Sequence, residues 1–373
     1  MDFSLDEDQV ALRDAVRRYC EGSYPLQERG NPETPEQARD RWKGLAQLGV
    51  LGMPIAAECG GGGLGATEVM LASHEFGRTL GGAGFVPAVV LCGHLLASGS
   101  PAMRQRWLPP LAAGEARVSF ACGAAEMRGD LTRPGVAAEA SGAGFVLRGE
   151  KAFVLETEQP DAVLLGARTA GREGDDSGLT LFVLETNQPG VVKQAFTTLD
   201  GRRAVGLRLD DVAVSADAVL GRLNEGHVLA REGVDRALAA WCSEATGAME
   251  ALFDQTLDYI KTRRQFGSPL IRFQALQHRM ANLLMSLELS RSMACAAAVA
   301  VEEATPAERR RIVDAAKVFV GQAGREAGHC AIQLHGGMGM TDECRVGHYA
   351  KRLMVLDQYF GNAADHLRRL ATT

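Results

Sequence analysis

Hydrophobic residues recur at roughly helical spacing over the first part of the chain. Ser4 followed by Glu7 has the form of a capping box, which marks the start of a helix. A glycine run at residues 59–65 has no Gly-Lys-Ser/Thr after it, so it is interpreted as a connection between helices and not as a phosphate loop. Residues 1–116 are therefore predicted to form a helical domain. The spaced apolar positions near the start are Val10, Leu12, Val16 and Tyr19.

From about residue 117 the pattern changes to short apolar runs, separated by Gly, Pro, Asp and Asn. Runs of this length and punctuation are typical of β-strands. Several of them within about a hundred residues predict a small β-barrel or sandwich domain over residues 117–222. The predicted strands are Val118–Cys122, Gly144–Leu147, Ala162–Gly166, Leu179–Leu184 and Val205–Val214.

Long helical patterns return from about residue 223 and continue to the end. Their many alanines predict close packing in a helical bundle over residues 223–373. The sequence therefore predicts an α+β multidomain protein. The predicted helices are Val228–Thr262, Phe273–Glu303, Ala307–Leu334 and a shorter one from about Val346.

The composition bears on which classes of function this protein can have. The 373 residues are 46% hydrophobic and 23% charged, which is typical of an ordinary soluble protein. The net charge of −6 gives no global attraction to nucleic acid or to anionic membranes, and no apolar run approaches a membrane span of roughly 20 residues. The eight cysteines form no Cys-x-x-Cys pair and no metal-ligand cluster is recognised, so we predict no metal. The acidic start lacks secretory-signal features, and we expect a cytoplasmic protein.

One basic stretch, Lys-Thr-Arg-Arg-Gln-Phe-Gly, closes a predicted helix. Gly267 and Pro269 are the residue types that stop a helix, so Arg263 and Arg264 are expected at its end. Guanidinium groups pair phosphate oxygens bidentately, which suits a diphosphate ligand. The alternative is that the two arginines only complement the helix dipole.

A second stretch, Gln-Leu-His-Gly-Gly-Met-Gly-Met, ends another helical run. Gly336, Gly337 and Gly339 carry no Cβ, so a ligand or a neighbouring chain can approach the backbone closely. His335 lies inside this stretch and is expected to pack against a ligand or a helix and not to transfer protons.

Together, the two stretches resemble the acyl-CoA dehydrogenase family. The resemblance implies that family's fold over essentially the whole length: an N-terminal α-helical domain, a middle β-barrel domain and a C-terminal four-helix bundle. It also implies FAD, oxidation of an acyl-CoA thioester to a trans-2-enoyl-CoA, an electron-transfer flavoprotein as acceptor, and a dimer of dimers. In the family, the matching residues hold the ADP half of the FAD in the adjacent subunit. They are Arg263, Gln265, Phe266, Gln333, Leu334, Gly336 and Gly337.

The catalytic base of the family has no clear counterpart. Its commonest form is a Glu in Tyr-Glu-Gly-Thr, and the matching position here is Phe360. Some members carry the base on the first bundle helix instead, where this chain has Ala237 beside Leu238. Asp235 would face away on a regular helix, and Glu244 matches a surface or interhelical carboxylate more often than a base. The catalytic residue is left unassigned.

Positions that serve the flavin ring and the substrate are also altered relative to the family. The ring-bonding Thr is replaced by Gly123 and a substrate-holding Ser by Gly129. In a later motif a Thr is replaced by Leu155 and a Trp by Phe153. The resemblance is closest to the small subunits of bacterial heteromeric enzymes, such as that of pimeloyl-CoA dehydrogenase.

The sequence therefore favours a subunit that completes the FAD site of a partner, such as a large acyl-CoA dehydrogenase subunit. Two alternatives stay open: a structural subunit without flavin of its own, and a self-sufficient homo-oligomer with an unrecognised base. An oxidase or monooxygenase on the same scaffold would need an acid near the flavin, which the sequence does not identify.

Overall fold

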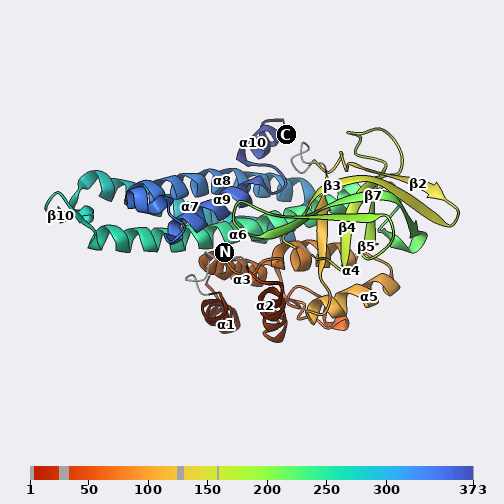
Figure 1. Cartoon of the computed structure of the whole chain (residues 1–373), viewed down its shortest axis with the longest axis horizontal. Helices are drawn as coiled ribbons and strands as arrows, with labels where there is room; N and C mark the ends of the chain where they lie inside the picture. The colour runs from red at the N-terminus through yellow and green to blue at the C-terminus, as the bar shows by residue number, and fades with distance from the viewer. Residues whose placement is uncertain (1–3, 25–32, 124–129, 158, 373) are drawn as a thin grey trace. The chain divides into compact units, whose positions relative to one another are not determined.

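A computed structural model describes residues 4–24, 33–123, 130–157 and 159–372 of the chain (Figure 1). The chain forms two compact units. The helical unit comprises Met1–Glu33, Ala66–Gly82 and Leu238–Thr373, and the sheet unit comprises Thr34–Gly65 and Ala83–Ala237. The domain boundaries predicted after residues 116 and 222 stay predictions.

The helical unit is a bundle in which α8 packs against α7, α9 and α10, and α3 packs against α1 and α7. The long helices predicted for the C-terminal region are confirmed, and each end lies within two residues of its predicted position. The helices are α1 (Glu7–Ser23), α3 (Ala66–Thr79), α6 (Gly226–Thr262) from residue 238 on, α7 (Gln274–Glu303), α8 (Pro306–His335), α9 (Arg345–Gln358) and α10 (Ala363–Thr372).

The start of α1 differs from the prediction. Asp6, not Ser4, is the N-cap: its backbone is extended and its carboxylate accepts a hydrogen bond from the Gln9 backbone N–H at 2.8 Å. The Gln9 side chain returns a bond to the Asp6 N–H, which completes a capping box. The capping-box prediction at Ser4 is wrong because Asp is an equally good cap and adds a negative charge that the helix dipole favours.

A buried charge network joins α1, α3, α6 and α7. Glu75 is fully buried and accepts hydrogen bonds from two nitrogens of Arg17, at 2.9 and 2.8 Å. His74 lies with Nε2 3.0 Å from the Glu250 carboxylate and with Nδ1 3.6 Å from Glu75. Arg291 pairs with Glu250 as well. Both carboxylates are thus held between cationic side chains.

These contacts change the pKa values of the network. Burial by itself raises the pKa of Glu75 and of Glu250, but hydrogen bonds and charges from His74 and the arginines outweigh it and lower both pKa values to about 2. Burial lowers the pKa of His74, and the two glutamates reverse this and raise it above its ordinary value. The network is therefore fully charged over a window from about pH 4.5 to about pH 6.5.

We expect acid to remove this stabilisation. A depressed carboxylate pKa contributes stability above the unfolded value of about 4.5, and the contribution is lost as the pH falls towards 2. The His74 contribution is complete below about pH 6.5 and is lost as the pH rises through its raised pKa. As the pH is lowered through the acid range, the unfolding free energy of the wild type should fall more steeply than that of Glu75→Gln. The difference in slope should be about 1.4 kcal/mol per pH unit. Chemical unfolding between pH 2 and 7 tests this, with the exposed Glu173→Gln as control; parallel pH profiles for Glu75→Gln and the wild type would contradict it.

The sheet unit is built around eight strands in the order β6-β7-β3-β1-β4-β5-β8, with β2 paired to both β3 and β4. Both β1 and β2 pair with β3 and with β4, so the sheet curves between β3 and β4. The unit also contains α2 (Pro35–Gln47), α4 (Gly93–Ala97) and α5 (Pro101–Ala112). Its strands are β1 (Val118–Cys122), β2 (Val136–Ser141), β3 (Gly144–Val154), β4 (Ala162–Arg168), β5 (Leu179–Glu185), β6 (Val191–Thr197), β7 (Arg203–Ser215) and β8 (Val219–Leu220).

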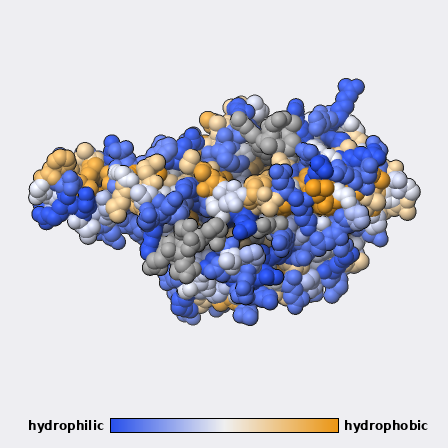
Figure 2. Space-filling view, in the orientation of Figure 1, coloured by the Kyte–Doolittle hydropathy of each residue, from blue (hydrophilic) through white to orange (hydrophobic). Residues whose placement is uncertain are grey.

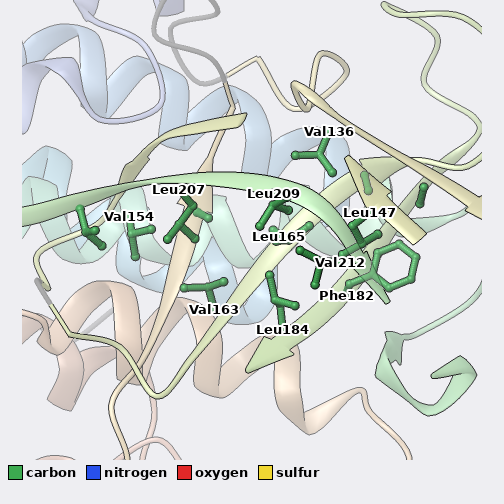
Figure 3. Packing of buried hydrophobic residues seen from close by; sticks show 14 residues of the cluster. Val136, Leu147, Val154, Val163, Leu165, Phe182, Leu184, Leu207, Leu209 and Val212 are labelled. Carbon is green, nitrogen blue, oxygen red and sulfur yellow. The ribbon is translucent and has the colours of Figure 1, made fainter. Parts of the chain in front are cut away.

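All five predicted strands are present, but the prediction missed β2, β6 and the short β8. The centre of the sheet is apolar because β4 is covered on both faces: its first six residues are buried in succession, and successive side chains point to opposite faces. Within the sheet, β4 lies parallel to β1 and antiparallel to β5. Apolar side chains from several strands meet in one core (Figure 3). Those labelled there are Val136, Leu147, Val154, Val163, Leu165, Phe182, Leu184, Leu207, Leu209 and Val212.

Candidate functional site

The basic stretch lies on a hairpin with a two-residue turn that directly follows the end of a helix. α6 ends at Thr262, and β9 (Arg264–Gln265) pairs with β10 (Ser268–Pro269). Phe266 and Gly267 form the turn, with φ of 53° and 79°. Two consecutive turn residues with positive φ indicate a type I′ turn, whose twist matches that of the two strands. Arg263 lies at the helix end, as predicted, and its backbone N–H donates to the Tyr259 carbonyl at 2.8 Å. Gly267 itself does not stop the helix, because it lies five residues after Thr262 and serves the hairpin turn.

The hairpin presents its side chains to solvent. Arg263, Arg264 and Gln265 are exposed, and Phe266 is 89% exposed. A non-glycine residue in the left-handed region costs roughly 1 kcal/mol or more, and the hairpin holds Phe266 there. Hydrophobic atoms also gather at this end of the helical unit, where Figure 1 places β10 (Figure 2). An exposed aromatic ring beside guanidinium groups suits a planar, phosphate-bearing ligand.

The glycine stretch follows directly on α8. Gly336 has φ 63° and ψ −144°, a conformation that is open to glycine and costly for other residues. A Cβ built on Gly336 or Gly337 would meet nothing within 4 Å, so the backbone here is open to an approaching group. Gln333 is exposed, whereas the Leu334 side chain is buried, so any contact from Leu334 would come through its backbone.

His335 joins the two stretches, which are far apart in the sequence. Its ring stacks on Tyr259 of α6, with centroids 4.2 Å apart and planes at 22°. Its Nδ1 lies 2.8 Å from the Ala331 carbonyl oxygen, and burial lowers its pKa. The ring packs against a helix, as expected, and fixes the glycine stretch beside the end of α6 that carries the hairpin.

Phe360, at the position expected for the base, lies in a closed aromatic cluster. It is 3% exposed and has φ 55°. Its ring stacks on Trp241 with centroids 6.0 Å apart, and Tyr359 lies 4.7 Å from the same indole. The phenyl ring therefore fills buried space and cannot itself accept a proton.

The two candidate carboxylates are both buried, and Glu244 is committed to another contact. Glu244 is buried in the helical unit and accepts hydrogen bonds from two nitrogens of Arg352, at 2.8 and 2.7 Å. Arg352 is also buried, and its guanidinium lies over the Tyr359 ring at 5.7 Å. Glu244 is thus the counter-ion of an arginine. Asp235 is buried in the sheet unit, on the part of α6 before residue 238.

Arg352 is a residue that the sequence analysis missed. It lies on the buried side of α9, whose neighbouring buried residues are mostly apolar. A lone arginine among them is a signal of a buried acidic partner, since an unpaired charge in such a place costs several kcal/mol. The sequence does not say which acid that partner is.

The positions expected near a flavin ring lack hydroxyl groups. A Cβ on Gly123 would lie 2.7 Å from the Arg133 carbonyl oxygen, so the backbone must shift to accept any larger residue there. Leu155 is buried in the sheet unit, where its carbonyl accepts a hydrogen bond from Ser119 at 2.6 Å. Phe153 packs on Phe196, with centroids 5.8 Å apart. Gly129 lies outside the described residues.

Lys151, in the same motif as Phe153, is buried and is held by backbone carbonyl groups. Its ammonium donates to the carbonyl oxygens of Gly166, at 2.7 Å, and of Pro134. Burial lowers its pKa to about 7. Lys151 thus ties β3 to β4 and to the segment that leads into β2. Elsewhere in the described residues, no three His, Cys, Asp or Glu side chains gather as a metal site would require.

Known proteins resemble the chain along its whole length. The chain is 26% identical to the short-chain specific acyl-CoA dehydrogenase of Clostridium acetobutylicum over 371 residues, covering 97% of each protein. It is 26% identical to the human mitochondrial short-chain specific acyl-CoA dehydrogenase over 340 residues, covering 88% of this chain and 82% of the human protein.

Solved structures share the fold. Butyryl-CoA dehydrogenase from Megasphaera elsdenii superposes with a TM-score of 0.90 at 23% identity, covering 100% of this chain and 99% of that one. A chain of the ChsE4-ChsE5 complex from Mycobacterium tuberculosis gives a TM-score of 0.86 at 25% identity, covering 100% and 98%.

Two family models match the chain: the acyl-CoA dehydrogenase N-terminal domain over residues 6–115 and the acyl-CoA dehydrogenase C-terminal domain over residues 224–373. These matches together cover more than half of the sequence, and the C-terminal match contains both exposed motifs. The chain belongs to the acyl-CoA dehydrogenase family.

Proposed function

We propose that this chain completes the FAD site of a partner subunit in a heteromeric acyl-CoA dehydrogenase, of the kind in which a small subunit assists a large one. The family consists of flavin-dependent oxidoreductases that act on acyl-CoA, and FAD is the cofactor. Bound FAD would supply the acceptor for the hydride of the acyl β-carbon, and a base would be needed for the α-proton.

The observation that carries the proposal is the contrast between the two groups of site residues. The residues that would hold the ADP half face outward: the Arg263–Phe266 hairpin is exposed and Gly336 and Gly337 are open. The position of the base is occupied by Phe360, which packs on Trp241 inside the helical unit. Such a chain can contact the FAD of a neighbouring subunit, but it lacks the base at the expected position of its own substrate site.

The energetic consequence follows from the missing base. A positioned general base contributes roughly 10²- to 10⁴-fold to the rate. Glu244 does not replace it, because its carboxylate is the counter-ion of the buried Arg352. A homo-oligomer of this chain is therefore expected to be a poor dehydrogenase, although the ADP contacts remain. The ChsE4-ChsE5 complex is a precedent for two different chains together in this fold.

Visible absorption tests the proposal. The chain purified alone should be colourless, or yellow without bleaching when acyl-CoA thioesters are added anaerobically. Adding a large acyl-CoA dehydrogenase subunit should restore bleaching and transfer of electrons to an electron-transfer flavoprotein. Full bleaching of the lone chain would contradict the proposal and indicate a hidden base. A colourless complex whose activity does not depend on this chain would indicate a structural subunit.

Arg263→Ala should weaken flavin retention by the complex. Loss of a charged hydrogen bond to a phosphate costs about 1.5 to 3 kcal/mol, which corresponds to roughly 10- to 100-fold in the dissociation constant of FAD. The measurement is the fluorescence of flavin released on dilution. Arg222→Ala, which removes a highly exposed arginine of the sheet unit, is the matched control. Equal flavin retention by the two variants would remove Arg263 from the site.

A further inference from the structure

Helix α10, the last of the chain, is attached to the bundle by few buried side chains. It has ten residues and packs on α8 (Figure 1). Its buried residues are Ala363 and His366, whereas Leu367 is 50% exposed. A helix shorter than about 12 residues is marginal in water on its own, so tertiary contacts must hold it in place. Because the alanine buries little apolar surface, His366 is the main buried anchor.

His366 is held by a hydrogen bond to α8. Its ring is fully buried, and Nδ1 lies 2.6 Å from Oδ1 of Asp314, which is also buried. A carboxylate only accepts hydrogen bonds, so Nδ1 carries the proton and, in the neutral ring, Nε2 carries a lone pair. Nε2 has no hydrogen-bond partner within the part of the chain that the structure describes, and a Cβ built on Gly361 would lie 3.5 Å from it. A second proton, on Nε2, would thus be a buried donor without an acceptor.

Positive charge surrounds this pair on the α8 side. The Nε of Arg310 lies 3.3 Å from the second oxygen of Asp314. Lys317, three residues beyond Asp314, is buried and donates to a backbone carbonyl of α9. Asp357, at the end of α9, accepts a hydrogen bond from the first backbone N–H of α10 at 3.1 Å. The two cations on α8 oppose a positive charge on the His366 ring that packs beside them.

The charged groups of α10 itself act in the same direction. Arg369, one turn after His366, has Nη1 3.7 Å from Asp314 and 3.4 Å from the Nδ1 of the histidine. Asp365 is turned to the start of the helix, where it accepts a hydrogen bond from the Asn362 N–H at 3.0 Å. The carboxylate bonded to the histidine is therefore already shared with arginines.

The pKa of His366 follows from these contacts. Burial lowers it, the hydrogen bond to Asp314 partly offsets this, and the charges of Arg369 and Lys317 lower it again. When α10 is detached, the ring is exposed and its pKa returns to about 6.5. The detached helix therefore binds the proton more readily than the docked one. Docking is complete above about pH 6.5 and weakens by up to about tenfold for each pH unit below it.

We propose that α10 is a latch that acid releases, in which a proton taken up by His366 detaches the helix from α8. The helix also holds the backbone beside the aromatic cluster: Nη2 of Arg369 donates to the Phe360 carbonyl oxygen at 3.2 Å, and Gly361 lies against the histidine ring. Release therefore frees residues 359–362 as well. It involves only side chains of this chain, so it depends neither on FAD nor on a partner subunit.

Hydrogen exchange of the full chain, followed by mass spectrometry at about pH 7.5 and about pH 5, tests the proposal. After correction for the intrinsic pH dependence of exchange, residues 359–372 should be about tenfold less protected at the lower pH, and the rest of α9 should be equally protected at both. Glu75 and Glu250, whose pKa values are lowered to about 2, stay charged over this range, so acid does not unfold the bundle through them. Equal protection of α10 at the two pH values would overturn the proposal.

His366→Asn separates the uptake of this proton from other effects of acid. The asparagine amide can donate to Asp314 from near the position of Nδ1, but it does not titrate. The protection of α10 should then be independent of pH. His329→Asn, which changes an exposed histidine of α8, is the matched control and should keep the wild-type pH dependence. A loss of protection in acid that persists in His366→Asn, or one that His329→Asn abolishes, would assign the effect to another group and overturn the proposal.

Discussion

Gly247→Ala is expected to destabilise the protein by about 3 kcal/mol or more, although it adds a single methyl group. A Cβ on Gly247 would lie 1.9 Å from the His74 carbonyl oxygen, and one on Gly77 would lie 1.9 Å from the Glu244 carbonyl oxygen. Helices α3 and α6 therefore touch backbone to backbone at two reciprocal positions. The new methyl group meets main-chain atoms, which cannot move aside as a side chain can, so the helices must separate.

Thermal unfolding of the full chain measures this effect, and a midpoint lower by about 4 °C or more is expected for a protein of this size. Gly22→Ala is the matched control, because Gly22 is also within a helix and its added Cβ would meet nothing within 4 Å. That control should be neutral or stabilising by up to about 1 kcal/mol, since alanine is the better helix former. Similar midpoints for the two variants would contradict the close contact.

Arg352→Met should cost about 3 to 5 kcal/mol, because it leaves the buried carboxylate of Glu244 without its counter-ion. Both side chains of the pair are almost fully inaccessible, and the guanidinium donates to the carboxylate through two nitrogens. Glu244→Gln, which leaves the arginine charge without its counter-ion, should be destabilising for the same reason.

The double variant Glu244→Leu/Arg352→Met removes both charges. It therefore separates the destabilisation by an unpaired buried charge from the stability that the ion pair contributes. Replacing a whole buried ion pair by apolar residues is often neutral or stabilising by about 1 to 4 kcal/mol. We therefore expect the double variant to be more stable than either single one, measured by chemical unfolding at pH 7. Additive losses would mean that the two side chains are not energetically coupled, which would contradict the stranded-charge explanation.

The fold was predictable where local pattern and tertiary environment agree. β4 and β5 are continuous apolar runs because both faces of these strands are covered, and the sequence analysis found both. β2 was missed because its sequence, Val-Ala-Ala-Glu-Ala-Ser, is rich in residues that do not favour strands. Its strand conformation comes from an antiparallel ladder with β3, in which all six residues have partners.

The sequence predicted those features of the candidate site that depend only on which residue stands at a position. The sequence located the stretches around Arg263 and Gly336 and pointed to Phe360 in place of a carboxylate. It placed Arg263 correctly at the end of α6. It did not find the hairpin, because the Phe-Gly pair can stop a helix or form a type I′ hairpin turn, and only the pairing of β9 with β10 decides between them.

The sequence by itself determined the family, the order of helical and strand regions and the chemical character of the two exposed motifs, since all of these depend on local pattern and residue type. The tertiary structure decided which distant groups meet: Tyr259 with His335, Arg352 with Glu244, and Trp241 with Phe360. The physical reason is that each of these partnerships depends on how helices pack, and a side chain's identity does not specify its neighbour across a helix interface.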